Sequence, residues 1–281
     1  MLVTLNEVLK DAQKNKYAVG LFNTVNLEMA RGVIAAAEET NSPVIIGTAE
    51  VLLPYAGLEE LASLLVPMAK KASVPVVLHF DHGLTPEMII KSMVLGFSSV
   101  MYDCSTGSFE ENIEKCREMK TIAKSFGASI EAELGHVGSA AANAAEADGH
   151  DGIYTDPDEA KEFVERTQVD ALAIAIGTAH GVYKSKPVLN LEILKEIAAM
   201  TSTPLVLHGG SGLSDEDFRN CIQSGISKVN IFTDINCAAA KAAAESYRDG
   251  CGMTDLMGNI VQAVKTVAME KMKIFGCTNK G

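Results

Sequence analysis

The chain has 281 residues, of which 47% are hydrophobic and 21% are charged, a balance that excludes an intrinsically disordered protein. The formal net charge of −12 excludes nucleic acid as an expected partner, because the sequence has no basic stripe that could follow a phosphate backbone. The sequence also has no apolar run near the roughly eighteen residues of a membrane span and no signal-peptide pattern at its start, so we expect a cytoplasmic protein without a membrane partner.

Strand-like and helix-like segments alternate along the whole chain. At the N-terminus, Thr4 followed by Glu7 predicts a capped helix. Nearly continuous apolar runs typical of buried parallel strands cover residues 18–25, 43–49, 74–82, 98–105, 128–137, 171–180, 204–210 and 228–234. Helical periods cover residues 27–40, 86–96, 110–127, 156–167, 190–201 and 214–225.

Eight strand–helix units predict an α/β protein with the TIM (β/α)8 barrel fold, and no linker divides residues 1–281 into more than one domain. The amphipathic segment 253–276 predicts a C-terminal helical extension that covers the barrel or contributes to a subunit interface. Residues 135–157 form the longest irregular stretch, and its position after the fifth strand predicts a mobile lid over the active site.

Three histidines follow strand-like runs: His82, His180 and His208. In a barrel the C-terminal strand ends meet at one face, where active sites lie. One such histidine is more often structural, but three together predict an open metal site. Neutral imidazoles favour Zn²⁺ over Mg²⁺ or Ca²⁺, which prefer oxygen ligands, so we expect one catalytic zinc ion per subunit.

Asp81 directly precedes His82. On a regular strand the two side chains would point to opposite faces, so the strand must end or twist here, which Gly83 would permit. Two roles for Asp81 remain open: an acid/base beside the metal, or a carboxylate that holds a ligand histidine.

The glycine-rich turn after the seventh strand predicts a phosphate site. Gly209, Ser211 and their neighbours would offer backbone N–H groups, with a helix N-terminus close by. Asn230 and Thr233 add polar groups at the end of the eighth strand, and Gly181 would let a ligand approach the backbone. A tight turn also requires glycine, so the turn alone would be a weak signal.

Acidic residues lie on the fourth and fifth strands. Glu131 and Glu133 share one face and should point into the barrel, where they and Asp103 could orient ligands, bind a second cation or form structural pairs. Of the other histidines, His79 is expected to pack near the site, whereas His136 and His150 belong to the 135–157 stretch.

The motifs together resemble the class II, zinc-dependent ketose-phosphate aldolases, the family of fructose- and tagatose-bisphosphate aldolases. The resemblance covers nearly the whole chain: Phe22–Asn23, LHFDHG, SSVMYDCS followed by FEENI, EAELGHVG, GTAHGVY, LHGGSGL and KVNIFTDI. The order of the DHG, GTAHG and HGGSG elements is its most specific part.

The resemblance implies a lyase of carbohydrate metabolism or glycolysis that cleaves a ketose phosphate to dihydroxyacetone phosphate and an aldehyde. Zinc on the three histidines would polarise the ketone, and Asp81 would exchange the proton at the C4 oxygen. The residues implied to hold the dihydroxyacetone-phosphate half are Gly181, Gly209, Ser211, Asn230 and Thr233. Asp103 and Glu133 match acidic positions near the metal or its alternative site, and family members often use a monovalent cation near the phosphate.

Two departures from the family pattern concern the rest of the substrate. The segment GSAAANAAEAD replaces the usual GGxED, so the family's loop glutamate has no aligned counterpart, and Glu146 or Asp148 would have to substitute. The C-terminal region lacks the basic segment that supplies an arginine to a distal phosphate, with Arg248 the only nearby candidate. An unphosphorylated aldehyde partner is therefore an alternative.

Other functions were weighed against the aldolase. A metal-dependent sugar-phosphate epimerase could use the same barrel, and a non-catalytic sugar-phosphate binder would not need Asp81. A Schiff-base aldolase needs a lysine inside the barrel, and Lys228 is expected at the wrong end of its strand. The expected partners are a small phosphorylated sugar and further copies of the chain in a homodimer or homotetramer.

Overall fold

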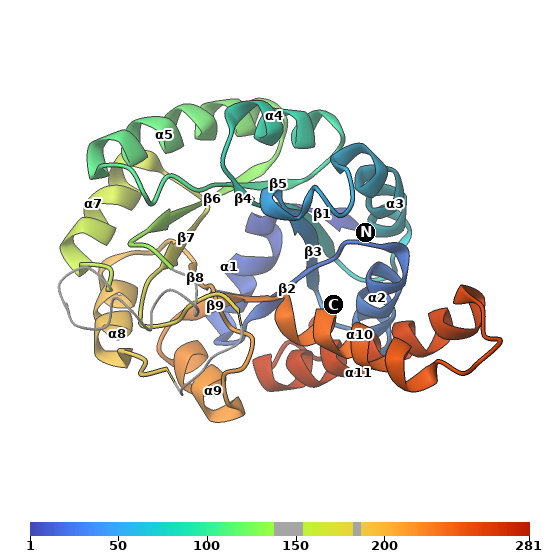
Figure 1. Ribbon diagram of the computed structural model, residues 1–281. Coiled ribbons are helices and arrows are strands. Elements are labelled where there is room, and N and C mark those ends of the chain that lie inside the picture. The colour runs from blue at the N-terminus through green and yellow to red at the C-terminus, as the bar shows by residue number, and fades with distance from the viewer. Residues whose placement is uncertain (138–153, 182–186) are drawn as a thin grey trace.

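Eight parallel strands close into a barrel in the computed structural model, which describes residues 1–137, 154–181 and 187–281 (Figure 1). Each strand pairs with the next along the chain, and the last pairs back to the first, with Leu21 opposite Asn230. The strands are β2 Val19–Asn23, β3 Val44–Ala49, β4 Val76–Gly83, β5 Ser99–Tyr102, β6 Ser129–Leu134, β7 Ala171–Ile174, β8 Leu205–Leu207 and β9 Ile226–Ile231. The predicted TIM-barrel fold is confirmed.

Helices form the outer layer around the barrel (Figure 1). They are α2 Leu27–Thr40, α3 Leu58–Lys71, α4 Pro86–Val94, α5 Phe109–Ser125, α7 Pro157–Thr167, α8 Leu191–Met200, α9 Asp215–Gln223 and α10 Thr233–Ser246, with a short 3-10 helix η1 at Glu50–Leu52. Several begin at a side chain that accepts a first-turn N–H, namely Asn26, Ser108, Asp156, Asn190 and Ser214. These caps satisfy donors that would otherwise be left unpaired and fix where each helix begins.

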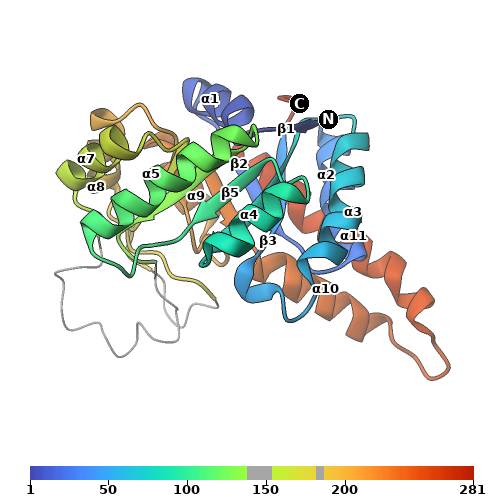
Figure 2. The same cartoon turned by 90° about the horizontal axis from the view of Figure 1, so that it is seen from above.

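The N-terminal segment closes one end of the barrel. Strand β1 (Leu2–Val3) pairs with the first residues of β4, ahead of the point where β5 begins to pair with β4. Helix α1 (Leu5–Asn15), which has the predicted Thr4–Glu7 capping box, then lies across the N-terminal strand ends and contacts β2, β6 and β9 (Figure 2). The opposite end of the barrel, where the strands finish, is left for the site.

Two helices, α3 and α10, were not predicted. Pro67 lies inside α3, and proline normally ends a helix, which weakens the helical signal of that segment. Residues 228–234 were predicted as one strand, but β9 ends at Ile231 and α10 begins at Thr233. The predicted strand 171–180 is also too long, since β7 ends at Ile174. Both errors lie at C-terminal strand ends, where the chain turns into functional loops.

The predicted C-terminal helix is α11 (Met253–Phe275), which packs along α2 and α10. Gly32 of α2 makes this contact close, because a Cβ atom there would lie 2.8 Å from the carbonyl oxygen of Val261. The connection between α10 and α11 projects from the barrel with Tyr247 and Met253 exposed (Figures 1 and 2).

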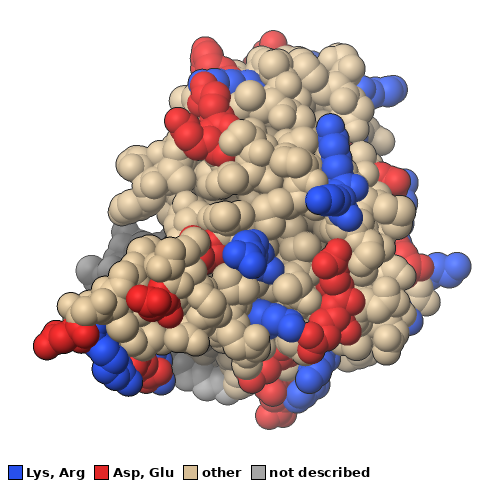
Figure 3. Space-filling view, turned by 90° about the vertical axis from the view of Figure 1, so that its right-hand side faces the viewer, with Lys and Arg blue, Asp and Glu red and all other residues tan. Residues whose placement is uncertain are grey.

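Charge is mixed on the side of the molecule that carries α2, α3 and the α10–α11 hairpin. Acidic and basic side chains are interspersed there, and a wide area between them carries neither (Figure 3). Within the described residues, no helix combines the length and the apolar character needed to cross a membrane.

Candidate active site

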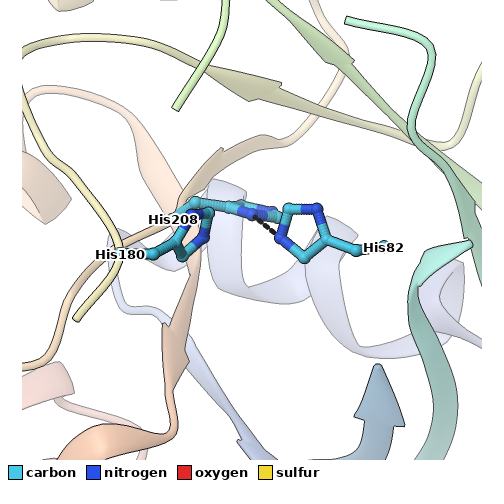
Figure 4. A group of neighbouring side chains, drawn as sticks. All are labelled: His82, His180 and His208. Atoms are coloured by element: carbon cyan, nitrogen blue, oxygen red, sulfur yellow. Dashed lines mark hydrogen bonds between the residues drawn. The ribbon is translucent and has the colours of Figure 1, made fainter. Parts of the chain in front are cut away.

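Three histidines converge at the C-terminal end of the barrel strands. His82 is the next-to-last residue of β4, His208 directly follows β8, and His180 lies in the segment after β7 (Figure 4). One ring nitrogen from each lies within 4.8 Å of the other two. The structure therefore brings together the three residues that the sequence predicts as metal ligands.

The second nitrogen of each ring already has a partner. Nδ1 of His82 lies 2.8 Å from Oδ2 of Asp103, and Nδ1 of His180 lies 3.1 Å from the carbonyl oxygen of Val137. Nε2 of His208 lies 2.9 Å from Oε1 of Glu131. An acceptor at one nitrogen fixes the neutral tautomer and turns the lone pair of the other nitrogen outward.

The lone pairs that remain face one another. They belong to Nε2 of His82, Nε2 of His180 and Nδ1 of His208, and the first and last of these atoms are 2.9 Å apart. Nε2 of His180 is buried without a hydrogen-bond partner among the described residues. Such an unsatisfied buried acceptor is costly in a protein, so the three rings fit a metal ion at this point.

Electrostatics at the cluster also suit a cation. Burial, followed by the charges of His82 and His208, lowers the pKa of His180 to about 3, and burial lowers the pKa of His208. Burial alone would lower the pKa of His82 too, but the neighbouring Asp81 and Asp103 outweigh it and raise that pKa to about 9. Two rings are thus neutral ligands, and the carboxylates around the third favour positive charge.

The backbone at His82 lets adjacent side chains serve one site. The pairing of β4 with β5 shifts register between Phe80 and Gly83, which confirms the predicted irregularity. The strained residue, however, is His82 itself, with φ of 42°, an uncommon conformation for a residue other than glycine. Gly83 is required for packing instead, because a Cβ there would lie 2.4 Å from Ile89.

Asp81 is 2% exposed and is held by two asparagines. Nδ2 of Asn23 donates to its Oδ2 at 2.7 Å, and Nδ2 of Asn230 lies 3.2 and 3.3 Å from its two oxygens. Burial alone would raise the pKa of Asp81, but the charge of His82 and further polar neighbours hold it well below its usual range. The resulting carboxylate lies beside the histidines and can accept a proton.

Lys228 occupies a place that the sequence did not indicate. Its side chain is fully buried inside the barrel, with Nζ 2.8 Å from Oε2 of Glu131 and 2.7 Å from Oδ1 of Asn230. The expectation that Lys228 lies at the wrong end was therefore wrong: its side chain reaches the centre. Because an ammonium only donates, it requires the oxygen of Asn230 and leaves the amide NH₂ for Asp81. Lys228 thus joins the carboxylate behind His208 to the amide that holds Asp81.

Glu133 and Asp103 lie next to the histidines, as the sequence predicts. Oε1 of Glu133 accepts the backbone N–H of Val137 at 3.0 Å, and its Oε2 lies 3.6 Å from Nδ1 of His208. Burial and then the charge of Asp103 raise the pKa of Glu133 to about 8. Together with His82, these two carboxylates form a second group of possible metal ligands.

All five residues predicted to hold the phosphorylated half line one cavity of about 510 Å³ together with Asp81 and two of the histidines. The five are Gly181, Gly209, Ser211, Asn230 and Thr233. Gly209 has a positive φ of 64°, and a Cβ there would lie 2.4 Å from the carbonyl oxygen of Ala179, so only glycine fits.

The same turn meets the start of a helix. Oγ of Ser211 accepts the backbone N–H groups of Phe232 and Asp234, both at 3.3 Å, which ties the turn to the first residues of α10. The N-cap position is Phe232, whose side chain provides no capping hydrogen bond. Ser211 thus takes the place of a cap for the N–H of Asp234. The N-terminus of α10 lines the cavity, where the helix dipole favours an anion.

Some predicted positions lie elsewhere. Glu146, Asp148 and His150 lie outside the described residues, as does most of the segment expected to form a lid. Arg248 lies in the α10–α11 connection, where its Nη1 donates to the carbonyl oxygens of Glu245 and Tyr247.

Asn23 is a functional candidate that sequence reasoning named only within the resemblance. Its position at the end of β2 was the one available signal. The apolar cavity residues Ala49, Val51, Leu52 and Leu84 were missed, because no motif marks them, and Phe232 was not singled out within the KVNIFTDI motif.

Comparisons with known proteins indicate one enzyme family. The family model described as fructose-bisphosphate aldolase class-II matches residues 3–280. A Bacillus subtilis protein named probable fructose-bisphosphate aldolase is 39% identical over 285 residues, with 99% of each chain covered. A protein of Escherichia coli K12 named uncharacterized protein YdjI is 44% identical over 280 residues, covering 100% of this chain and 99% of the relative.

The structural comparison leads to the same group. The crystal structure described as the YdjI aldolase from Escherichia coli K12 superimposes with a TM-score of 0.89 at 41% identity, covering 100% of this chain and 99% of that one. A structure described as a putative fructose-1,6-biphosphate aldolase from Coccidioides immitis gives 0.88 at 30% identity, with 98% and 97% covered. The chain belongs to the class II fructose-bisphosphate aldolase family, whose members are metal-dependent lyases acting on phosphorylated sugars.

Proposed function

We propose that the protein is a zinc-dependent aldolase that reversibly cleaves a ketose 1-phosphate or ketose 1,6-bisphosphate to dihydroxyacetone phosphate and an aldehyde, with residues 1–281 acting as one domain. One observation carries the proposal: a three-histidine cluster, a buried carboxylate and a phosphate-type turn all border one cavity. Each of the three is needed for a different part of this reaction.

His82, His180 and His208 would hold the zinc ion. Three imidazoles, each neutral once it binds a metal, suit zinc better than magnesium or calcium and leave a coordination position open for substrate. When bound, the ion would supply Lewis acidity at the substrate carbonyl. Asp103, Glu131 and the carbonyl of Val137 would keep the three rings in the required tautomers.

Asp81 would act as the acid/base. In the cleavage direction its carboxylate takes the proton from the C4 hydroxyl, the C3–C4 bond breaks, and C4 leaves as the aldehyde carbon. The electron pair of that bond stays with the three-carbon fragment, which takes up a proton at C3 to become dihydroxyacetone phosphate. Asn23 and Asn230 orient the carboxylate for this transfer.

Gly181, Gly209, Ser211, Asn230 and Thr233 would hold the C1 phosphate and its three-carbon unit. The turn and the N-terminus of α10 supply N–H groups, which is how an acidic protein can bind an anion locally. A monovalent cation near the phosphate would add to this binding. Asp103 and Glu133 would support the metal or a second cation position.

Two versions of the proposal differ in whether the aldehyde product carries a phosphate. The names of the relatives favour a 1,6-bisphosphate. One observation favours an unphosphorylated aldehyde, in a sugar-catabolic branch of the family: among the described residues that line the cavity there is no lysine or arginine. A second phosphate would find no cationic partner there.

A retro-aldol screen tests the proposed function. Purified protein loaded with zinc should release dihydroxyacetone phosphate from at least one ketose 1-phosphate or 1,6-bisphosphate, and chelation should abolish the release. Unchanged activity after complete removal of metal would contradict a zinc aldolase. Stereoinversion without a three-carbon product would indicate an epimerase instead.

We also propose that the chain forms a homodimer or homotetramer. The α10–α11 hairpin extends from the barrel with Tyr247 and Met253 more than half exposed, and exposed apolar side chains on a projecting element are typical of a subunit contact. Light scattering on the purified protein gives the mass directly, and a monomer at micromolar concentration would refute this part.

A further inference from the structure

Three apolar residues form one side of the cavity mouth. Val51 and Leu52 lie in η1, after β3, and Leu84 directly follows β4; we call these three residues the apolar rim. Val51 is 62% exposed and Leu84 is 50% exposed, so large apolar side chains face the open cavity. Apolar surface at a ligand site commonly contacts an apolar part of the ligand.

The rim is held in place by a single side chain. Oε2 of Glu50 accepts the backbone N–H groups of Leu84 and Thr85 at 2.7 and 3.2 Å, and its Oε1 accepts the hydroxyl of Thr85 at 2.9 Å. These bonds join the loop after β3 to the loop after β4. Three charge-assisted hydrogen bonds therefore hold together the two loops that carry the rim.

The rim lies across the barrel from the phosphate turn. In the closed order of strands, β3 lies four strands from β7 and β4 lies four strands from β8; Gly181 and Gly209 lie in the segments that follow β7 and β8. The histidine cluster draws on β4, β7 and β8 and so lies between the two. A substrate with its phosphate in the turn and its carbonyl at the histidines must direct its other end toward the rim.

The rim offers an anion no partner among the described residues. The acidic side chains of the described lining, Asp81 and Asp103, lie at the histidine cluster, and the carboxylate of Glu50 is engaged with backbone N–H groups behind the rim. The described lining contains no lysine or arginine. A phosphate or carboxylate at the far end of the substrate would meet apolar groups without a cationic partner, which costs binding energy.

We propose that the apolar rim binds the terminal carbon of the aldehyde half and selects a methyl group, so that the preferred substrates are 6-deoxyketohexose 1-phosphates. This inference rests on the proposed aldolase activity and specifies its substrate class. Cleavage between C3 and C4 then yields dihydroxyacetone phosphate and 2-hydroxypropanal, with the same proton and electron movements as above. Val51 and Leu84 are the specificity-determining residues.

The test compares three substrates of one configuration on the zinc-loaded enzyme, in both the fructose and the tagatose series. They are the 6-deoxyketohexose 1-phosphate, the ketohexose 1-phosphate and the ketohexose 1,6-bisphosphate. The rim predicts that kcat/KM for the first exceeds the second by about tenfold, the usual effect of one small group in an apolar pocket. It should exceed the third by about a hundredfold or more, because the second phosphate is desolvated against apolar side chains without a cationic partner.

Two variants of Val51 link the preference to the rim. Val51→Thr keeps the shape and adds a hydroxyl, so the preference for the deoxy substrate should fall about threefold. Val51→Arg adds the missing cation and should raise kcat/KM for the 1,6-bisphosphate about tenfold. Val94→Thr and Val94→Arg are matched controls, because Val94 is also exposed but lies at the end of α4, outside the cavity lining.

The outcomes separate this inference from the proposed function. If no ketose phosphate releases dihydroxyacetone phosphate, the aldolase proposal itself fails. If release occurs but the 1,6-bisphosphate is preferred, or Val51→Thr leaves all three ratios unchanged, the aldolase proposal stands and the rim inference is overturned.

Discussion

The two sides of the cavity differ in how their chemistry is built. On the side of β7, β8 and β9, fixed polar groups determine what binds: histidine nitrogens with set tautomers, a glycine turn and the N-terminus of α10. On the side of β3 and β4, beyond His82, the surface is apolar and braced by one carboxylate. We therefore expect these polar groups, together with Asp81 and His82 at the end of β4, to determine the reaction, and the apolar residues to determine which substrate is accepted.

The largest expected effect is on the acid/base. Asp81→Ala should lower kcat by about a thousandfold for every substrate, because proton transfer by a positioned group contributes about 10² to 10⁴. Zinc content should remain near that of the parent, since Asp81 is not one of the three ring ligands. Stopped-time assays with metal analysis would measure both. A loss confined to one aldehyde would move Asp81 to the substrate-selecting side.

The buried ion pair of Lys228 and Glu131, which lies next to His208, should give the next largest effect. Removing Lys228 by Lys228→Met leaves the fully buried Glu131 without its cation, which typically costs about 3–5 kcal/mol of stability. Zinc affinity should fall about tenfold to a hundredfold, because Glu131 orients His208. Denaturant titration and competition with a chelator would measure the two effects.

A double variant provides the control for that prediction. Lys228→Met combined with Glu131→Gln removes both charges, so it should recover part of the stability lost in Lys228→Met but not the zinc affinity. Equal stability of the single and double variants would contradict the ion-pair account.

The same pair predicts a pH dependence of stability. Burial alone would raise the pKa of Glu131, but Lys228 and the hydrogen bond to His208 outweigh it and lower the pKa to about 2, from 4.5. A lowered pKa contributes stability that is present above pH 4.5 and is lost as pH falls toward 2. The stability difference between the parent and Glu131→Gln should therefore be constant from pH 7 to 5 and shrink below pH 4.5.

The phosphate turn should affect all substrates alike. Ser211→Ala removes the acceptor of two backbone N–H groups at the start of α10, and the loosened turn should raise KM about tenfold, roughly the value of one such hydrogen-bonded unit. Because every substrate carries the C1 phosphate, the ratio between the deoxy substrate and the 1,6-bisphosphate should stay constant. A changed ratio would show that the two sides of the cavity are not independent.

The smallest effect is expected for Glu50, which joins the two loops that carry the apolar rim. Glu50→Gln keeps a hydrogen-bond acceptor but loses the charge, so the rim should remain in place less firmly. The preference for the deoxy substrate should fall by about twofold to threefold, measured as the ratio of kcat/KM values. Glu59→Gln, at an exposed position on α3, is the control.

Sequence patterns were sufficient for the barrel and for the polar part of the site. Hydrophobic periodicity located the eight strands, and a polar residue at the end of an apolar run placed His82, His180 and His208 at one face. Both patterns depend only on the order of neighbouring residues along the chain. It also locates Ser211 and Asn230, which follow or end their strands.

Such sequence patterns do not predict contacts across the barrel. Whether Lys228 reaches Glu131 or solvent depends on the tilt of the strands and on side-chain length, which no local pattern records. The apolar rim was missed for another reason: Val51 and Leu84 resemble ordinary loop residues until the fold brings them to one cavity. The end or twist of the strand at His82 was expected and attributed to Gly83, but the residue with the positive φ is His82 itself.

The most direct measurement is a zinc titration of the metal-free enzyme with continuous detection of dihydroxyacetone phosphate. We expect the rate to rise linearly with zinc and to stop rising at one equivalent per subunit, and a His208→Ala variant to show no rise in that range. A rate that is independent of zinc, or a His208→Ala variant with the same break point and slope, would contradict a three-histidine zinc centre.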